Sequence, residues 1–307
     1  MPTLRGRDFL DVADLSRDEL RHVLELAHAI KAGSWKERPL EGMHVAMLFQ
    51  KPSHRTRVSF EVGIGRLGGS TTTLGEHDVQ LGVRESVSDA ARVLDRYVDG
   101  IVARLRIHDD LVDLARSAEK PVINALTDRS HPCQVLADLM TLEEVGGDLS
   151  KHHVVYVGDG NNIATSLIEA SALAGFALTI VGPRAYHPAV SVIERARGLG
   201  DGLSRLTLTE EISDLDGATA IYADVWTSMG QEADKESRRH AFSRYQVNQA
   251  VLDRAPNAVF LHCLPAHRGE EVTDEVIDGP RSLVFQQAGN RLYAQMALMA
   301  ELMGKPA

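Results

Sequence analysis

The sequence predicts an α/β protein of two domains, in which each domain is a parallel β-sheet flanked by helices. Ten short apolar runs alternate with amphipathic segments of helical spacing, a pattern typical of parallel sheets covered by helices on both faces. The chain has 307 residues, and a domain usually takes about 100–200. The last amphipathic segment is long, and we expect this C-terminal helix to pack back on the N-terminal domain.

The first helix is predicted to begin after Ser16, because Ser16 and Glu19 form a capping box. The predicted strands cover residues 44–49, 70–75, 100–105, 121–126, 153–158, 177–182, 204–209, 220–226, 258–264 and 282–286. The other predicted helices cover residues 56–68, 85–98, 109–118, 134–145, 161–174, 187–198, 213–217, 246–254 and 290–303. A polar, glycine-bearing break at 143–153 separates the halves. We therefore expect an N-terminal domain 1–147 and a C-terminal domain 148–307 that includes the C-terminal helix.

Composition narrows the class of protein. The formal charge of -10 argues against a nucleic-acid partner or an anionic membrane surface. No apolar stretch approaches the roughly 18–20 residues of a membrane span, and the N-terminus lacks the apolar core of a secretion signal. The two cysteines, Cys133 and Cys263, indicate no disulfide framework. These features favour a cytoplasmic protein, and no Cys/His cluster has the spacing of a metal site.

The segment "KPSHRTRVSF" (51–60) places charge and hydroxyl groups where a predicted strand gives way to a helix. A helix N-terminus offers free backbone N–H groups and the positive end of the helix dipole, which together bind anions. Ser53 and Thr56 add hydroxyl donors, and Arg55 adds a planar guanidinium suited to phosphate oxygens. A capped helix with solvated arginines is the alternative, and this segment alone does not exclude it.

Other predicted strand ends carry polar groups as well. "GIVARL" ends with Arg104 and "PVINALTDRSHPCQ" leads to His131 and Gln134. Because the carboxyl ends of parallel strands lie at one edge of a sheet, we expect these side chains to converge with the 53–56 segment.

The second half repeats the pattern with different chemistry. "VVYVGDGNNIATSL" predicts a strand, a glycine turn and a helix, but Ile163 stands where a dinucleotide fingerprint needs its third glycine. Asp224 follows a strand and suits a substrate that carries an amine. Cys263, at the end of another strand, is a candidate for chemistry rather than for packing.

Five motifs then match a known family. In order and spacing, "SHRTR", "HPCQ", "GDGNN", "DVWTSMGQE" and "LHCLPAHRGEE" resemble the signatures of the ornithine carbamoyltransferases, within the aspartate/ornithine carbamoyltransferase family. The resemblance covers essentially the whole chain, and "SMG" with "HCLP" distinguishes the ornithine enzymes from their aspartate-specific relatives. It implies a homotrimer, or a multiple of trimers, of two-domain subunits, each with a carbamoyl-phosphate-binding domain followed by an ornithine-binding domain.

The resemblance also implies roles for individual residues. The ligands of carbamoyl phosphate would be Ser53, His54, Arg55, Thr56, Gln80, Arg104, His131, Pro132, Cys133, Gln134, Cys263, Leu264 and Arg291. The ligands of ornithine would be Asn162, Asp224, Ser228 and Met229. The catalytic residues would be Cys263, Asp224, Arg104 and His131. Gln80 would serve the site of a neighbouring subunit, and the Leu264–Pro265 peptide bond is expected to be cis.

The chain departs from the family's usual residues at two positions. His54 stands where threonine is usual, and Gly289 stands where glutamate is usual, close to Arg291. If position 54 binds phosphate mainly through its backbone N–H, either side chain serves there. The alternative is that the His54 imidazole is itself a ligand.

The implied reaction is transfer of the carbamoyl group of carbamoyl phosphate to the side-chain amine of L-ornithine, which gives L-citrulline and phosphate. Two alternatives stay open: a carbamoyltransferase for another amine such as putrescine, and a phosphate-binding scaffold without activity. The expected partners are these small substrates and further copies of the chain, with no nucleic acid and no membrane. Nothing in the reaction requires a metal or an organic cofactor.

Overall fold

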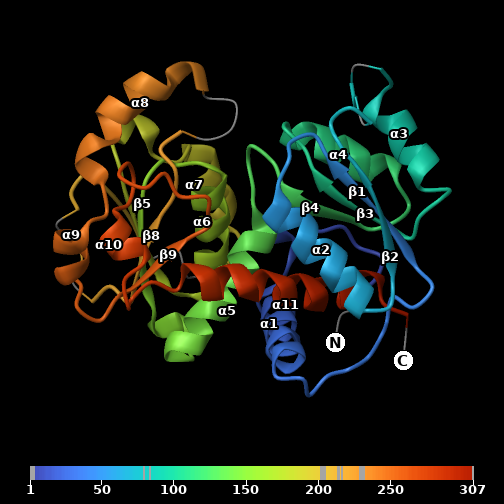
Figure 1. Cartoon of the computed structure of the whole chain (residues 1–307), viewed down its shortest axis with the longest axis horizontal. Coiled ribbons are helices and arrows are strands. Elements are labelled where there is room, and N and C mark those ends of the chain that lie inside the picture. Colours follow the sequence, from blue (N-terminus) through green and yellow to red (C-terminus); the bar gives the residue numbers. More distant parts are fainter. Residues whose placement is uncertain are drawn as a thin grey trace. The chain divides into compact units, whose positions relative to one another are not determined.

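A computed structural model describes residues 4–305, except 79, 83, 201–204, 213–214, 216 and 228–231. The chain divides into two compact units (Figure 1), which are described separately below. Unit 1 comprises Met1–Ala137 together with Arg291–Ala307, and unit 2 comprises Asp138–Asn290. None of the helices in the described part of the chain is long and apolar enough to cross a membrane.

Unit 1 contains a parallel sheet of four strands in the order β2-β1-β3-β4. The strands are β1 (His44–Phe49), β2 (Ser70–Leu74), β3 (Gly100–Arg104) and β4 (Val122–Leu126). The helices that begin in this unit are α1 (Arg17–Lys31), α2 (His54–Arg66), α3 (Val87–Leu94), α4 (His108–Ser117) and α5 (Pro132–Gly146). After β1 the chain turns one way to β2 and later returns to place β3 on the other side, so the order reverses between β1 and β3.

The strand β1 is buried along almost its whole length, because helices cover both faces of this sheet. Ala46 and Leu48 belong to an apolar cluster with residues of α3 and α4, among them Ala91 and Leu111. The intervening residue Met47 is also fully buried. The C-terminal part of α11 (Val284–Met303) packs on α2 in this unit: a Cβ at the position of Gly63 would lie 3.1 Å from Met296 and 3.2 Å from Met299.

Unit 2 contains a parallel sheet of five strands in the order β7-β6-β5-β8-β9. The strands are β5 (His153–Val157), β6 (Ala177–Val181), β7 (Leu206–Thr209), β8 (Ala220–Ala223) and β9 (Val259–His262). The helices are α6 (Asn162–Ala174), α7 (Val190–Arg197), α8 (Lys235–Phe242), α9 (Gln249–Asp253) and α10 (Asp274–Ile277), and α11 begins in this unit. Here the strand order reverses between β5 and β8.

The predicted fold is confirmed: both sheets are parallel and flanked by helices, and the C-terminal helix packs on unit 1. The predicted strand at 282–286 is wrong. Ser282 forms only a single bridge with Phe260, and α11 begins two residues later, at Val284. A short apolar run does not distinguish a buried strand from the first turn of a helix. The predicted helix 213–217 falls mostly outside the described residues.

The two compact units differ from the two predicted domains at both boundaries of unit 2. The predicted boundary between residues 147 and 148 lies in the loop after α5, whereas the units separate within α5. Residues from Arg291 onward group with unit 1 rather than with the C-terminal half. The helices α5 and α11 each contribute to both units, and no pattern of hydrophobic residues marks where a continuous helix changes its packing partners. The functional domains 1–147 and 148–307 stay a prediction.

Candidate active site

The first polar cluster lies where the order of the unit 1 sheet reverses. In parallel α/β sheets, ligands bind at the carboxyl ends of the strands at such a point. The Ser53–Thr56 segment follows β1, and Arg104 ends β3, which is hydrogen-bonded to β1. The topology therefore brings together two of the sequence-predicted strand ends.

The start of α2 is built around Thr56. The Ser53 side chain caps the helix by accepting from the Thr56 N–H (3.3 Å), and the Ser53 hydroxyl donates to Thr56 Oγ1 (3.1 Å). Arg291 Nη2 also donates to Thr56 Oγ1 (3.0 Å), and both residues are buried. Because the Thr56 oxygen accepts both bonds, its own hydroxyl proton remains to be donated to a ligand.

His131 lies immediately before α5, and its carbonyl accepts the first bonds of that helix, from the Gln134 and Val135 N–H groups. The imidazole is buried, and its pKa is held well below 6.5 by that burial and by the charges of Arg291, Arg104 and Arg55. Three guanidinium groups therefore act on one neutral imidazole. Such a cluster attracts a dianion and leaves a neutral N–H to bond a carbonyl oxygen.

The low pKa of His131 predicts a loss of stability in mild acid. Below about pH 6.5 the unfolded chain takes up a proton at this residue and the folded chain does not, so the free energy of unfolding falls as the pH falls. The slope is at most about 1.4 kcal/mol per pH unit for one group. His131→Gln should therefore lose less stability than the wild type between pH 7.5 and 5.5, by about 1 kcal/mol in urea unfolding. Equal losses would contradict a neutral buried imidazole.

The residues that follow His131 are buried in the N-terminal turn of α5. Cys133 donates from Sγ to the carbonyl of Asn124 (3.3 Å), and burial raises the pKa of its thiol to about 12. It is therefore a protonated packing residue of this turn. Pro132 occupies the first position of the helix, where proline is favoured, and Gln134 is buried.

His54 is exposed, and its Nε2 lies 3.5 Å from Arg55 Nη1. This placement favours the hypothesis that position 54 contributes its backbone N–H. We expect His54→Thr to change kcat/KM for carbamoyl phosphate by less than about threefold. The dependence of activity on pH should also keep its shape between about pH 5.5 and 7.5, where an ordinary histidine titrates. A tenfold loss would show that the imidazole itself binds phosphate.

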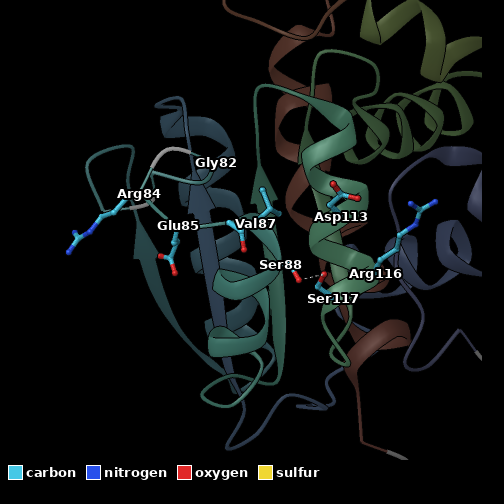
Figure 2. A pocket seen from close by; sticks show the side chains of 9 residues that line it. Gly82, Arg84, Glu85, Val87, Ser88, Asp113, Arg116 and Ser117 are labelled. Atoms are coloured by element: carbon cyan, nitrogen blue, oxygen red, sulfur yellow. Dashed lines mark hydrogen bonds between the residues drawn. The ribbon is translucent and has the colours of Figure 1, made fainter.

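Gln80 is an exposed residue of the loop between β2 and α3, and its carbonyl accepts from the Arg84 N–H (3.0 Å). The same loop borders an open hollow of about 820 Å³ on unit 1, shown in Figure 2. The residues that line the hollow include Arg84, Ser88 and Arg116 but none of the predicted ligands.

The second polar cluster lies where the order of the unit 2 sheet reverses. Asn161 caps α6 after β5, and its Oδ1 accepts from the N–H groups of Ile163 (2.9 Å) and Ala164 (3.3 Å). Its Nδ2 donates to Asp224 Oδ2 (2.6 Å), at the end of the neighbouring strand β8. Asp224 is buried, and its Oδ1 accepts from the Val225 N–H (2.8 Å) and from Cys263 Sγ (3.1 Å).

The glycines of "GDGNN" serve backbone packing. A Cβ on Gly160 would lie only 2.4 Å from the Pro188 nitrogen, and Gly158 has a φ of +154°. Between them, burial raises the pKa of Asp159 to about 6, although the paired Arg238 (2.5 Å) opposes the shift. The tight turn therefore reflects close chain approach and needs no bound dinucleotide.

Cys263 is positioned by the buried residues of the strand before it. His262 Nδ1 accepts from the Leu264 N–H (2.9 Å), so its Nε2 carries the proton and donates to Glu271 Oε1 (3.2 Å). The His262 N–H donates to Gln287 Oε1 (2.9 Å). The Leu264–Pro265 bond is cis, as predicted.

Asp224, His262 and Cys263 offer potential ligand atoms within 4.8 Å of one another. These atoms already bond within the protein, because Cys263 donates to Asp224 and both His262 nitrogens have partners. The expectation that no metal takes part stays a prediction.

Four positions singled out in the sequence need separate comment. Ser228 and Met229 lie outside the described residues. Asn162 is half-buried at the first position of α6, next to the capping Asn161. Gly289, the second departure from the family pattern, has open space where a Cβ would lie, so no packing constraint requires glycine there.

Comparison with known proteins identifies the family of both halves of the chain. The family model of the aspartate/ornithine carbamoyltransferase carbamoyl-P binding domain matches residues 7–144, and that of the Asp/Orn binding domain matches residues 150–302. The chain belongs to the aspartate/ornithine carbamoyltransferase family. Among its carbamoyltransferase relatives, the ornithine carbamoyltransferase of Symbiobacterium thermophilum is 49% identical, over 99% of this chain and 100% of that protein. The anabolic ornithine carbamoyltransferase of Pyrococcus furiosus is 48% identical over 98% of each chain.

Solved carbamoyltransferase structures agree with the fold. The ornithine carbamoyltransferase structure from Pyrococcus furiosus has a TM-score of 0.93 and 46% identity, over 100% of both chains. The one from Thermus thermophilus has a TM-score of 0.87 and 43% identity, over 96% of this chain and 98% of that one.

Sequence reasoning missed several polar residues that hold these clusters together. Asn161, at the start of the predicted helix 161–174, also bonds Asp224, and His262, next to Cys263, accepts from the Leu264 N–H. Asn161 lies next to Asn162 in "GDGNN", and His262 lies next to Cys263 in "LHCLPAHRGEE". Their position beside predicted ligands is a sequence signal for a role in the site. Arg238, the partner of Asp159, lies 79 residues away on the unpredicted helix α8. Nothing local in the sequence announces that pairing.

Proposed function

We propose that this protein transfers the carbamoyl group of carbamoyl phosphate to the side-chain amine of L-ornithine, giving L-citrulline and phosphate. The observation that carries the proposal is the hydrogen bond from the partly buried Cys263 Sγ to the buried Asp224 Oδ1 (3.1 Å), in a chain 49% identical over nearly its whole length to an ornithine carbamoyltransferase. The first cluster has the chemistry of a phosphate site, and the second has the chemistry of an amine site.

In the proposed first half of the reaction, unit 1 binds carbamoyl phosphate. Arg55 and the N–H groups at the start of α2 bind the phosphate oxygens. Arg104, the Thr56 hydroxyl and the neutral His131 imidazole bond the carbonyl oxygen as it gains charge in the transition state. Arg291 fixes Thr56 through its 3.0 Å bond and adds positive charge where phosphate leaves.

The amine substrate requires a negatively charged group that accepts a proton, whereas the phosphate requires positive charge. An alkylamine with a pKa of about 10.4 is only about 0.04% neutral at pH 7. Asp224 presents a buried carboxylate that orients the ammonium group and accepts its proton, directly or with the Cys263 thiol that already bonds it. The freed amine then attacks the carbamoyl carbon, and the C–O bond to phosphate breaks. Asn162, Ser228 and Met229 are the proposed contacts to the rest of ornithine.

The direct test is a colorimetric assay for the ureido product with carbamoyl phosphate and either ornithine or putrescine. We expect citrulline with ornithine and much slower product formation with putrescine. Faster reaction with putrescine would change the proposed acceptor. No ureido product with any amine, from protein that still binds carbamoyl phosphate, would identify a scaffold without activity.

We further propose a cytoplasmic homotrimer in which each Gln80 serves the site of a neighbouring subunit. Its exposure on a loop of unit 1 supports a role outside its own subunit.

The shared site predicts complementation between inactive variants. Gln80→Ala damages the neighbour's site and Arg55→Ala damages the subunit's own site. Mixed trimers should therefore contain some sites with neither defect. We expect dissociation and reassembly of a one-to-one mixture to restore activity well above that of either variant, with trimer mass checked by light scattering. A mixture of trimers that is no more active than its components would contradict the shared site.

A further inference from the structure

The turn that precedes His131 is stabilised by residues that lie outside the phosphate cluster. Thr127 and Ser130 close this turn, because the Thr127 N–H donates to the Ser130 carbonyl (2.9 Å) and the Ser130 N–H donates to Thr127 Oγ1 (3.3 Å). Both residues are fully buried. The turn connects β4 with α5, so its shape determines where the His131 side chain lies.

His108, at the start of α4, contacts the same turn twice. Its N–H donates to Asp128 Oδ1 (2.8 Å), and its Nδ1 lies 2.8 Å from Thr127 Oγ1. Its Nε2 faces Asp11 Oδ2 at 3.7 Å. A carboxylate only accepts hydrogen bonds, so the nitrogen that faces it carries a proton, and in the neutral ring Nδ1 accepts from the Thr127 hydroxyl.

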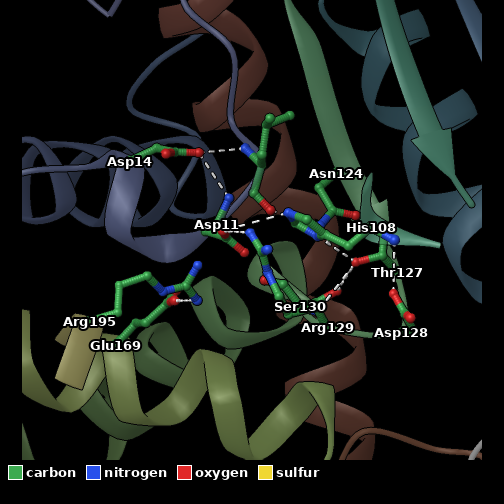
Figure 3. A network of polar contacts seen from close by, with 11 residues as sticks. Asp11, Asp14, His108, Asn124, Thr127, Asp128, Arg129, Ser130, Glu169 and Arg195 are labelled. Atoms are coloured by element: carbon green, nitrogen blue, oxygen red, sulfur yellow. Dashed lines mark hydrogen bonds and ion pairs between the residues drawn. The ribbon is translucent and has the colours of Figure 1, made fainter. Parts of the chain in front are cut away.

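Asp11 links the turn to the N-terminal segment (Figure 3). Its buried carboxylate accepts from Arg129 Nη2 (2.9 Å), and Arg129 belongs to the turn. The segment itself pairs with β4: the Phe9 N–H donates to the Val122 carbonyl (2.9 Å). From a segment that pairs with β4, Asp11 therefore bonds the turn at Arg129 and faces the His108 imidazole, which contacts the turn in its own right.

We propose that Asp11 is a positioning residue for the proposed carbamoyl transfer, acting on His131 through Arg129 and the His108–Thr127 pair. The proposal rests on the proposed function, in which the His131 imidazole bonds the carbonyl oxygen. A shift of the turn moves that donor away from the oxygen, and misplacement of a catalytic group by about 1 Å is enough to cost about a hundredfold in rate.

Asp8 offers a matched control. Its carboxylate accepts from the Val122 N–H (2.9 Å), so Asp8→Ala removes one bond to β4, while the Phe9 backbone bonds to β4 and the Asp11–Arg129 pair remain. We expect Asp11→Ala to lower kcat/KM for carbamoyl phosphate by tenfold or more and Asp8→Ala by less than threefold, at similar losses in Tm. If Asp11→Ala fails to fold, Arg129→Gln takes its place as the test. Arg129 is half-exposed, and we expect the same loss of tenfold or more in kcat/KM.

A double-mutant cycle separates positioning from general stability, because residues that act through one another are not additive. In a His131→Ala background, Asp11→Ala should cost less than a further twofold. The same tenfold loss in both backgrounds, or an equal loss in Asp8→Ala, would overturn the proposal.

An NMR measurement tests, independently of activity, whether Asp11 positions the His131 side chain. The Cε1–H signal of His131, assigned from the His131→Ala spectrum, should shift or split in Asp11→Ala and stay in place in Asp8→Ala. An unchanged signal in Asp11→Ala would overturn the positioning role. If the wild type forms no citrulline, the proposed function fails, and this comparison still tests whether Asp11 positions His131.

Discussion

Asp224→Asn is expected to lower kcat for citrulline formation by a hundredfold or more. The substitution keeps the shape of the side chain but removes the proton acceptor, and general-base catalysis is worth about 10²–10⁴ in rate. The new amide also conflicts with a present donor in either orientation, because its NH₂ group would face either the Asn161 Nδ2 (2.6 Å) or the Val225 N–H (2.8 Å), both of which now donate to Asp224. Asn161 cannot turn its amide around without losing the cap of α6, since its oxygen accepts from Ile163 and Ala164.

The control for this substitution is Asp253→Asn, at an exposed carboxylate of the same unit that bonds Arg281. We expect it to leave kcat within about twofold, because exposed ion pairs contribute about 0–1 kcal/mol. Carbamoyl-phosphate binding, measured by calorimetry, should survive in both variants. An Asp224→Asn protein with near-normal kcat would remove Asp224 from the mechanism.

Arg55→Ala is expected to lower kcat/KM for carbamoyl phosphate by more than tenfold. Removing one partner of a bound charge pair costs about 2–5 kcal/mol, and phosphate loses a bidentate donor. The remaining charges of Arg104 and Arg291 still act at this cluster, as their influence on the pKa of His131 shows. We therefore expect weakened binding rather than complete loss of the site.

Arg57→Ala is the matched control in the same turn of α2. Arg57 is exposed and pairs with Glu61 (2.9 Å) along the helix, an interaction worth about 0.3–0.5 kcal/mol. Circular dichroism should show both variants folded. Equal carbamoyl-phosphate affinity in the two variants would place the phosphate elsewhere.

The sequence predicted those parts of the site that depend on sheet topology. Ser53 and Asp224 follow strands and Arg104 ends one, and parallel sheets place the ends of neighbouring strands at one edge. Arg291 came only from the resemblance to a family, since it lies inside a helix whose spacing says nothing about Thr56, 235 residues earlier. His262 and Glu271 escaped notice because a buried polar pair is recognised only after the chain has folded around it.

The errors in the fold have a similar origin. The helix α8 was not predicted, because its sequence is mostly polar. Only Arg238 and Phe242 are buried in it, so it lacks the apolar stripe by which helices are predicted. The start of α11 resembles a strand in the sequence, because Leu283, Val284 and Phe285 form a short apolar run that does not distinguish a strand from the first turn of a helix.

The assignment of Arg291 to unit 1 has a consequence for biosynthesis. Ribosomes add residues in order, so the first 137 residues emerge long before the last segment of α11 is made. Until then Gly63 lacks Met296 and Met299 as packing partners, and Thr56 lacks the guanidinium that bonds it. The nascent N-terminal half is thus a fragment with an uncovered apolar surface, which exposes it to aggregation. Chaperone protection should accordingly matter most during the interval between synthesis of β4 and release of the finished chain.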